Sequence, residues 1–90
     1  MAERAVVRIV NRQGLHARPI SRFVQTVARF QAKVSVTGPD GTVADGASVF
    51  SMMTLAAGQG SELVLEADGG EAHQVIVALA ALVSEGFGEK

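Results

Sequence analysis

The sequence contains no cysteine, tryptophan or tyrosine, and none of its apolar runs is long. Without cysteine the chain has no disulfide framework, no thiolate metal site and no cysteine nucleophile. No run approaches the ~18 apolar residues of a membrane-spanning helix, and the first residues do not resemble a signal peptide, so we expect a cytoplasmic protein without membrane insertion. Four phenylalanines are too few aromatic residues for a surface that stacks the bases of single-stranded nucleic acid.

Length and composition indicate a single domain over residues 1–90. The 90 residues are 48% hydrophobic and 19% charged, which suits one core and leaves no room for a second. Residues 1–33 hold seven basic residues and one acidic residue, whereas residues 34–90 hold one basic and eight acidic residues. This asymmetry fits either a positive surface for an acidic partner or a phosphate, or an ordinary solvated surface.

Alternating apolar and polar residues predict four β-strands. The alternation covers residues 4–10 and 62–67, and two shorter runs at residues 34–36 and 42–45 flank a Gly-Pro-Asp-Gly turn. Such alternation is typical of antiparallel sheets in which one face packs on a core and the other meets water.

Apolar residues spaced three and four positions apart predict helices over residues 19–30 and 71–84, and a short helix over residues 49–57 follows Ser48. The order of elements is therefore β-α-β-β-α-β-α. It predicts an α+β fold, an open-faced β-sandwich in which three helices cover one face of a four-stranded, mainly antiparallel sheet. We expect the tail over residues 85–90 to be frayed, with Phe87 against the domain.

The segment Gly14-Leu15-His16-Ala17-Arg18-Pro19 joins the first strand to the first helix. Proline is tolerated in the first turn of a helix, so Pro19 marks a helix N-terminus. The free backbone amides of Ala17 and Arg18 should lie there, beside His16. Unpaired amides and the helix dipole favour an anion at this position, and the Arg18 guanidinium adds donors that suit phosphate oxygens.

His16 is the candidate nucleophile of this segment. An imidazole offers a free ring nitrogen at neutral pH without a separate activating base. Phosphoryl transfer mainly needs positioning and charge stabilisation, so His16 with Arg18 is suited to hold a phosphoryl group and pass it on. The alternative is a loop histidine beside a solvated arginine.

The segment and the element order resemble those of the HPr family, the histidine-containing phosphocarrier proteins of the bacterial phosphoenolpyruvate-dependent phosphotransferase system. Residues 48–55 and the Gly-Phe-Gly ending at residues 86–88 fit as well. The resemblance implies the same open-faced sandwich, and a phosphoryl group that Nδ1 of His16 accepts from phospho-enzyme I and delivers to an acceptor domain of the IIA type, assisted by Arg18. It implies a carrier rather than a free-standing enzyme.

Ser48 corresponds, by this resemblance, to the serine that an HPr kinase/phosphorylase modifies in many members of the family. An ordinary helix N-cap is the alternative role. Ala47 stands where the family often has lysine, and Ser51 where glycine or lysine is frequent, so regulation at Ser48 stays open.

The predicted second helix is too apolar for all of its side chains to fit on one inward stripe. We expect Phe50 and Leu55 in the core, and an exposed apolar patch of Val49, Met52 or Met53 beside His16. The resemblance implies that the first two helices dock enzyme I and the acceptor domains. The partner-binding residues expected on this surface are Ser21, Arg22, Gln25, Val49, Ser51, Met52 and Met53.

No second catalytic group stands out elsewhere in the sequence. His73 is expected at the surface, and two histidines without cysteine do not suggest a metal site. We expect a monomer that needs no cofactor and binds no nucleic acid.

A regulatory protein-binding module that acts through the second helix and Ser48 is the alternative to a phosphoryl carrier, whereas a small-molecule enzyme has little support. Within the carrier hypothesis, residues 11–14, the pair Met52-Met53 and the ending favour the nitrogen-related branch over sugar uptake, without deciding between the two.

Overall fold

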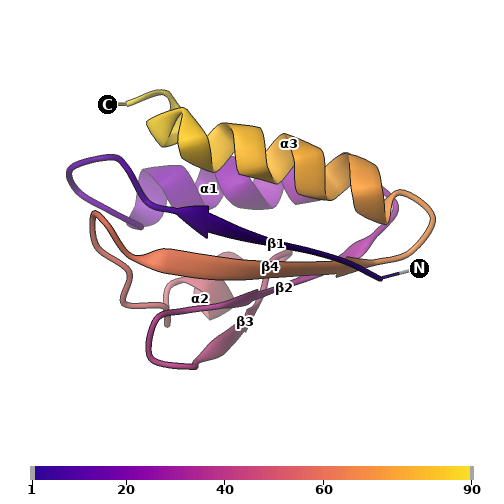
Figure 1. Ribbon diagram of the computed structural model, residues 1–90, viewed down its shortest axis with the longest axis horizontal. Coiled ribbons are helices and arrows are strands. Elements are labelled where there is room, and N and C mark those ends of the chain that lie inside the picture. The colour runs from indigo at the N-terminus through magenta and orange to yellow at the C-terminus, as the bar shows by residue number, and fades with distance from the viewer. Residues whose placement is uncertain (1, 90) are drawn as a thin grey trace.

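The computed structural model describes residues 2–89 (Figure 1). The strands and α-helices of the described chain follow one another in the predicted order. The elements are β1 (Ala2–Arg8), α1 (Ala17–Val27), β2 (Lys33–Thr37), β3 (Val43–Asp45), α2 (Val49–Met52), β4 (Glu62–Asp68), α3 (Ala72–Ser84) and a final 3-10 helix, η1 (Gly86–Gly88).

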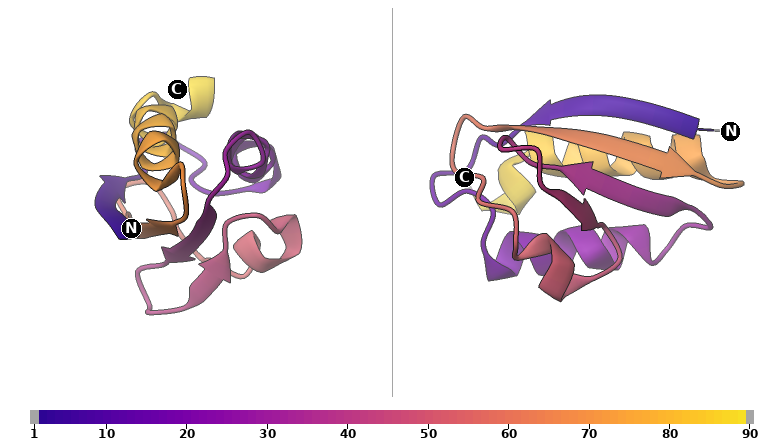
Figure 2. Two further views of the ribbon diagram at one scale, coloured as in Figure 1. Left: turned by 90° about the vertical axis from the view of Figure 1, so that its right-hand side faces the viewer. Right: turned by 90° about the horizontal axis from the view of Figure 1, so that it is seen from below.

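The four strands form one sheet in the order β1-β4-β2-β3, and every neighbouring pair is antiparallel. β1 and β4 pair along their whole length, with Ala5 opposite Leu65. Helices α1, α2 and α3 lie on the same side of the sheet and leave its other side open (Figure 2). The predicted open-faced α+β sandwich is confirmed.

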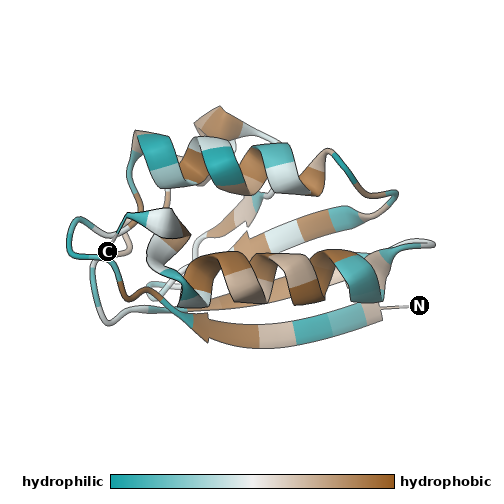
Figure 3. Cartoon of the chain, turned by 90° about the horizontal axis from the view of Figure 1, so that it is seen from above, coloured by the Kyte–Doolittle hydropathy of each residue, from teal (hydrophilic) through white to brown (hydrophobic). Residues whose placement is uncertain are grey.

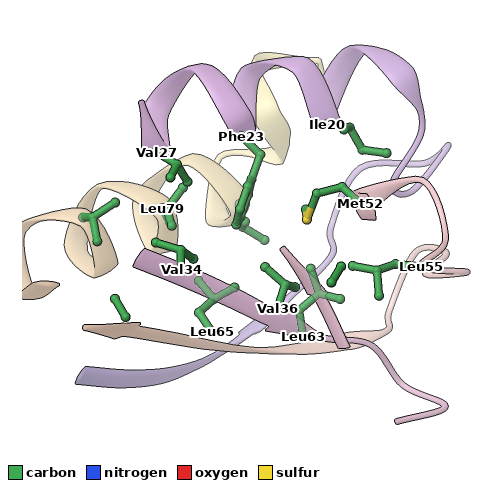
Figure 4. Close-up of a cluster of buried hydrophobic side chains, with 14 of the residues drawn as sticks. Ile20, Phe23, Val27, Val34, Val36, Met52, Leu55, Leu63, Leu65 and Leu79 are labelled. Atoms are coloured by element: carbon green, nitrogen blue, oxygen red, sulfur yellow. The ribbon is translucent and has the colours of Figure 1, made fainter. Parts of the chain in front are cut away.

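The hydrophobic core lies between the inner face of the sheet and the helices (Figure 4). Burial alternates along β4, so that Leu63, Leu65 and Ala67 face the helices as the sequence predicts. Ile20 and Phe23 enter the same core from α1, and this packing holds the beginning of that helix in place above the sheet. The largest fully buried side chains are Phe23, Phe87, Ile9, Ile20, Met52, Leu63, Leu65, Leu79, Val34, Val36, Val75 and Val83.

The C-terminal tail is folded through Glu89, so the predicted fraying of residues 85–89 is wrong. Phe87 is buried as predicted, and its backbone φ is 57°. A bulky residue rarely adopts this left-handed conformation, and burial of the aromatic ring compensates for the strain. Lys90, the last residue of the predicted tail, lies outside the described residues.

Helix α2 ends at Met52 rather than at the predicted Ala57. The Thr54 hydroxyl donates to the Ser51 carbonyl at 2.6 Å, which tightens the turn that follows the helix. Because the chain leaves the helix here, the Ala57 carbonyl is available to a distant partner, and it accepts a hydrogen bond from the Leu15 amide at 2.9 Å. The early helix end therefore anchors the loop that carries His16.

The inward and outward side chains of α2 differ from the prediction. Phe50, expected in the core, is 86% exposed, and Met52, expected in the exposed patch, is fully buried. The two residues lie about 200° apart around a helix, so only one of them can face the sheet. Leu55 lies in the core, as predicted.

Candidate functional site

Helix α1 begins at Ala17, before the predicted start at Pro19, and His16 is its N-cap. The His16 carbonyl accepts the Ile20 amide at 3.0 Å, which is the first hydrogen bond of the helix. The amides of Ala17 and Arg18 precede this bond and have no partner within the helix. Pro19 has no amide hydrogen to leave unpaired, so its place in the first turn is favourable.

The His16 side chain makes no capping hydrogen bond to the helix, and the first turn of α1 contains no acidic residue. At most helix starts a serine, threonine or aspartate oxygen would accept from these amides. Here the positive end of the helix dipole is directed at solvent beside an imidazole that is 33% exposed. An incoming anion would meet two amides that no carboxylate of the first turn competes for.

The loop before His16 packs closely against the segment after α2. Gly14 has a φ of 69°, and a Cβ atom placed on it would lie 2.6 Å from the Ala57 carbonyl oxygen. Both the backbone conformation and the close approach require glycine at this position. Together with the hydrogen bond from Leu15 to Ala57, this contact fixes the position of His16 relative to α2.

Two residues that the sequence analysis missed, Asn11 and Glu89, complete the surroundings of His16. Oε1 of Glu89 lies 3.0 Å from Nε2 of His16 and accepts a hydrogen bond from Nδ2 of Asn11 at 2.8 Å. Oε2 of the same carboxylate is 4.0 Å from Nη1 of Arg18. The hydrogen bond from His16 lowers the pKa of the Glu89 carboxyl below its usual value of 4.5. Nδ1 of His16 has no hydrogen-bond partner among residues 2–89.

The sequence contains only a weak signal for these two residues. Asn11 directly follows the alternating residues of the first predicted strand, and a polar residue there indicates a loop without assigning a role to its side chain. Glu89 lies 73 residues after His16, and no local pattern connects the two.

The positive charge of residues 1–33 is only partly neutralised in the fold. On β1, Arg8 pairs with Glu62 of β4 at 3.0 Å. Neither Arg22 on α1 nor Arg29, which follows the end of α1, forms an ion pair with any of residues 2–89. The side of the molecule that carries α1 therefore keeps positive charge that no ion pair within residues 2–89 neutralises, in the middle of the helix and just after its end.

The predicted partner surface spans α1 and α2, which lie side by side (Figure 2). Most of its predicted members are exposed, and Phe50 adds a side chain that was not predicted there. Met52 has to be removed from the set because its side chain faces the core. The exposed residues are Ser21, Arg22 and Gln25 on α1, and Val49, Phe50 and Met53 in or just after α2.

Ser48 and Ser51 both have structural roles. The Ser48 hydroxyl oxygen accepts a hydrogen bond from the Ser51 amide at 3.2 Å and so caps α2. The Ser51 hydroxyl oxygen in turn accepts from the Asp45 amide at 2.8 Å, which ties α2 to β3. The N-cap role of Ser48 is confirmed, while its phosphorylation stays a prediction.

His73 lies on the exposed side of α3, as predicted, with Nδ1 3.2 Å from Oε1 of Glu3. Within residues 2–89 no group of three or more His, Asp or Glu side chains could hold a metal ion. No helix in that range is long and apolar enough to cross a membrane.

Comparison with known proteins gives a consistent result. Residues 3–85 match the family model described as the PTS HPr component phosphorylation site. The chain is 40% identical over 83 residues to a phosphocarrier protein HPr of Neisseria meningitidis, covering 92% of each chain, and 32% identical over 89 residues to the phosphocarrier protein NPr of Klebsiella oxytoca, covering 99% of each. Its fold matches the crystal structure of HPr-C-His from Thermoanaerobacter tengcongensis with a TM-score of 0.91 and 34% identity over 98% of both chains.

Proposed function

The chain belongs to the HPr family of phosphocarrier proteins, and we propose on that basis that Nδ1 of His16 receives a phosphoryl group from phospho-enzyme I and passes it to an IIA-type acceptor domain. Membership makes the protein a phosphocarrier of the phosphotransferase system rather than an enzyme. The identity of the donor and acceptor, and a cytoplasmic location, are parts of the proposal.

One observation carries this proposal: His16 stands at a helix start whose amides no side chain caps. A phosphoryl group on Nδ1 brings negative charge to the place where the amides of Ala17 and Arg18 and the positive end of the dipole are available. The Arg18 side chain is 73% exposed and can swing towards the group, adding a charge-assisted hydrogen bond. These groups stabilise the transferring charge without enclosing it, which suits a carrier that must meet two partners.

The proposed docking surface for both partners is the exposed set on α1 and α2. Phe50 and Met53 present large exposed apolar side chains in or just after α2, the helix that packs beside α1, and exposed apolar groups of this kind often mark partner surfaces. Arg22 adds positive charge that would steer an acidic partner. Both partners would use the same surface in turn because both must reach one imidazole.

Phosphoenolpyruvate with enzyme I tests the proposal directly. The wild-type protein should acquire an acid-labile, alkali-stable phosphoryl group, and His16→Ala should lose it completely. His73→Ala is the matched control because His73 is the other histidine of the chain and is exposed. Equal labelling of wild type and His16→Ala would refute the assignment.

A regulatory protein-binding role is the second candidate, and the 86% exposure of Phe50 on a short helix favours it. If the protein acts mainly by binding, Met53→Asp should abolish complex formation while phosphorylation of His16 by phosphoramidate stays unchanged. Modification of Ser48 by an HPr kinase/phosphorylase would belong to this role. A Met53→Asp variant that keeps every partner's affinity would count against it.

The branch of the system can be determined with the first enzymes of both branches. The relatives include HPr and NPr proteins, so similarity does not separate sugar uptake from nitrogen-related regulation. In a purified mixture, the enzyme that phosphorylates His16 at the higher kcat/KM identifies the branch.

A further inference from the structure

Asn11 ties the C-terminal tail to the loop that carries His16. Its side chain is 1% exposed, and its Nδ2 donates to the Gly14 carbonyl at 2.7 Å and to Oε1 of Glu89 at 2.8 Å. Both neighbours are acceptors, so the opposite orientation of the amide would place oxygen against oxygen. The two hydrogen bonds therefore define which end of the Asn11 amide faces Glu89.

The Asn11 side chain is also incompletely satisfied. Among residues 2–89, its buried Oδ1 has no hydrogen-bond partner. Both hydrogen bonds of the Asn11 side chain to this part of the protein therefore come from its Nδ2.

The Glu89 carboxylate constrains the imidazole of His16. An ionised carboxylate can only accept, and its Oε1 lies 3.0 Å from Nε2, so Nε2 must carry the hydrogen. The low pKa of Glu89 agrees with an ionised group at neutral pH. Among residues 2–89, two other charged groups lie near the carboxylate: Nη1 of Arg18 is 4.0 Å from Oε2 of Glu89, and Arg12 lines the same cavity as Arg18 and Glu89. Asn11 is neutral.

We infer that Asn11 and Glu89 are positioning residues for His16: Asn11 holds the Glu89 carboxylate on Nε2, and the carboxylate keeps Nε2 protonated and the Nδ1 lone pair free for phosphorus. This inference rests on the proposed function. It extends the proposed site from the motif to a loop residue and a tail residue that the motif does not contain.

The phosphoryl step shows what this arrangement supplies. The Nδ1 lone pair forms the N–P bond while the donor's bond to phosphorus breaks, and its electron pair leaves with the donor. The ring becomes an imidazolium whose proton stays on Nε2, where the Glu89 carboxylate stabilises it. In the onward step the N–P bond breaks and its electron pair returns to Nδ1, which restores a neutral imidazole as the leaving group. By keeping Nε2 protonated, the carboxylate favours formation of the N–P bond and allows a neutral imidazole, rather than an imidazolate, to leave in the onward step.

The test uses potassium phosphoramidate, which phosphorylates histidine without any partner protein. A His73→Gln background leaves His16 as the only histidine, and ³¹P NMR follows the formation and loss of phosphohistidine between pH 5 and 10. We expect Glu89→Gln to slow both formation and loss roughly tenfold at neutral pH, as removal of one charge-assisted hydrogen bond implies. The pH profile of the rate of loss should change as well, because the carboxylate that accepts from Nε2 is then missing.

Three further variants separate positioning from a structural role. Glu85→Gln removes an exposed acid from the same tail and should leave the rates unchanged, and Glu89→Asp should restore part of the rate. Asn11→Ala should slow transfer, but the double variant Asn11→Ala/Glu89→Gln should be no slower than Glu89→Gln alone, because Asn11 acts through Glu89. Glu89 lies in the tail and outside the core, so its variants test the inference even if Asn11→Ala fails to fold.

Rates and pH profiles in Glu89→Gln that equal those of wild type would overturn the inference, as would a double variant whose loss is the product of the two single losses. Either result leaves His16 phosphorylated and the proposed function intact. If the proposed function itself fails, enzyme I and phosphoenolpyruvate leave wild-type His16 unlabelled, which is a different observation.

Discussion

The starts of α1 and α2 show two ways to treat the free amides of a helix. At α2, the Ser48 hydroxyl accepts the Ser51 amide, so a neutral side chain of the protein satisfies the helix start. At α1, the N-cap is His16, its side chain makes no capping bond and instead faces Glu89 of the tail. One helix start is complete by itself, whereas the other has amides available to an anion from outside.

The difference indicates that α1 lacks, at the proposed site, the stability that a capped N-terminus would give it. A serine at position 16 would cap α1 in the way that Ser48 caps α2, and such a cap is worth about 1 kcal/mol. The sequence has histidine there, together with an exposed arginine and a proline that removes one amide.

A separate difference concerns α1 and α3 as whole helices. α1 has alternating hydrophilic and hydrophobic residues, while α3 is hydrophobic over most of its length (Figure 3). The helix with the polar outer face carries the site.

Replacing the histidine N-cap of α1 by serine, the N-cap residue of α2, should have the largest effect, because it removes the proposed phosphorylation site. His16→Ser should abolish labelling by enzyme I and phosphoenolpyruvate. Its free energy of unfolding in urea should exceed that of His16→Ala by about 1 kcal/mol, because both variants lose the contact with Glu89 and only serine can cap the helix. Equal stabilities of the two variants would break the comparison between the helix starts.

A substitution that displaces the loop before His16 should have the next largest effect, and this effect is on stability. Gly14→Ala should lower the free energy of unfolding by about 3 kcal/mol, because a positive φ and a clash with the Ala57 carbonyl act together. Gly41→Ala is the control: its φ is 89°, but nothing lies within 4 Å of the added Cβ, so it should lose only about 1–2 kcal/mol. Urea denaturation measures both, and equal losses would show that the packing against Ala57 contributes nothing.

Removing the cap of the second helix start should have a smaller effect. Ser48→Ala should lower the free energy of unfolding by about 1 kcal/mol, since the Ser51 amide loses its acceptor. Labelling of His16 by enzyme I should be unchanged, because the Ser48 cap of α2 takes no part in the contacts of His16. A Ser48→Ala variant that is as stable as wild type but poorly labelled would assign Ser48 to the partner surface instead.

Low pH should weaken the contact between Glu89 of the tail and His16 at the start of α1, and this effect should be the smallest. The His16 hydrogen bond lowers the pKa of Glu89, so the contact contributes its full stability above the usual value of 4.5 and loses it as the pH falls through the lower pKa of the folded state. Tail resonances of residues 86–89 in NMR spectra should change in that range. In Glu89→Gln the same resonances should lack this transition, and its persistence would mean that another group is responsible.

The sequence predicted the fold well because the fold depends on local periodicity. Alternation in residues such as Leu63 and Leu65 assigns the inner face of a strand, and the motif around Pro19 assigns a helix start. The inward and outward sides of α2 could not be predicted in this way, because a single helical turn has no period, and Phe50 and Met52 are both apolar. The burial of Met52 is decided by the packing of α1 and the sheet around it.

The residues of the candidate site also fall into a group that local sequence predicts and a group that it does not predict. His16, Arg18 and the free amides belong to one contiguous segment, so the sequence could predict their proximity. Asn11 and Glu89 come to His16 through the path of the loop and the folding of the tail around Phe87, and neither depends on a repeated pattern. Contacts of this kind follow from the assembled fold.

The most direct measurement of the central claim compares ¹H–¹⁵N and ³¹P NMR spectra before and after phosphorylation by enzyme I. The account predicts a phosphorus resonance on Nδ1 of His16, large shifts of the amides of Ala17 and Arg18, and no comparable shift of the Ser51 amide at the capped start of α2. A phosphoryl group on another residue or on Nε2, or unshifted amides at Ala17 and Arg18, would contradict it.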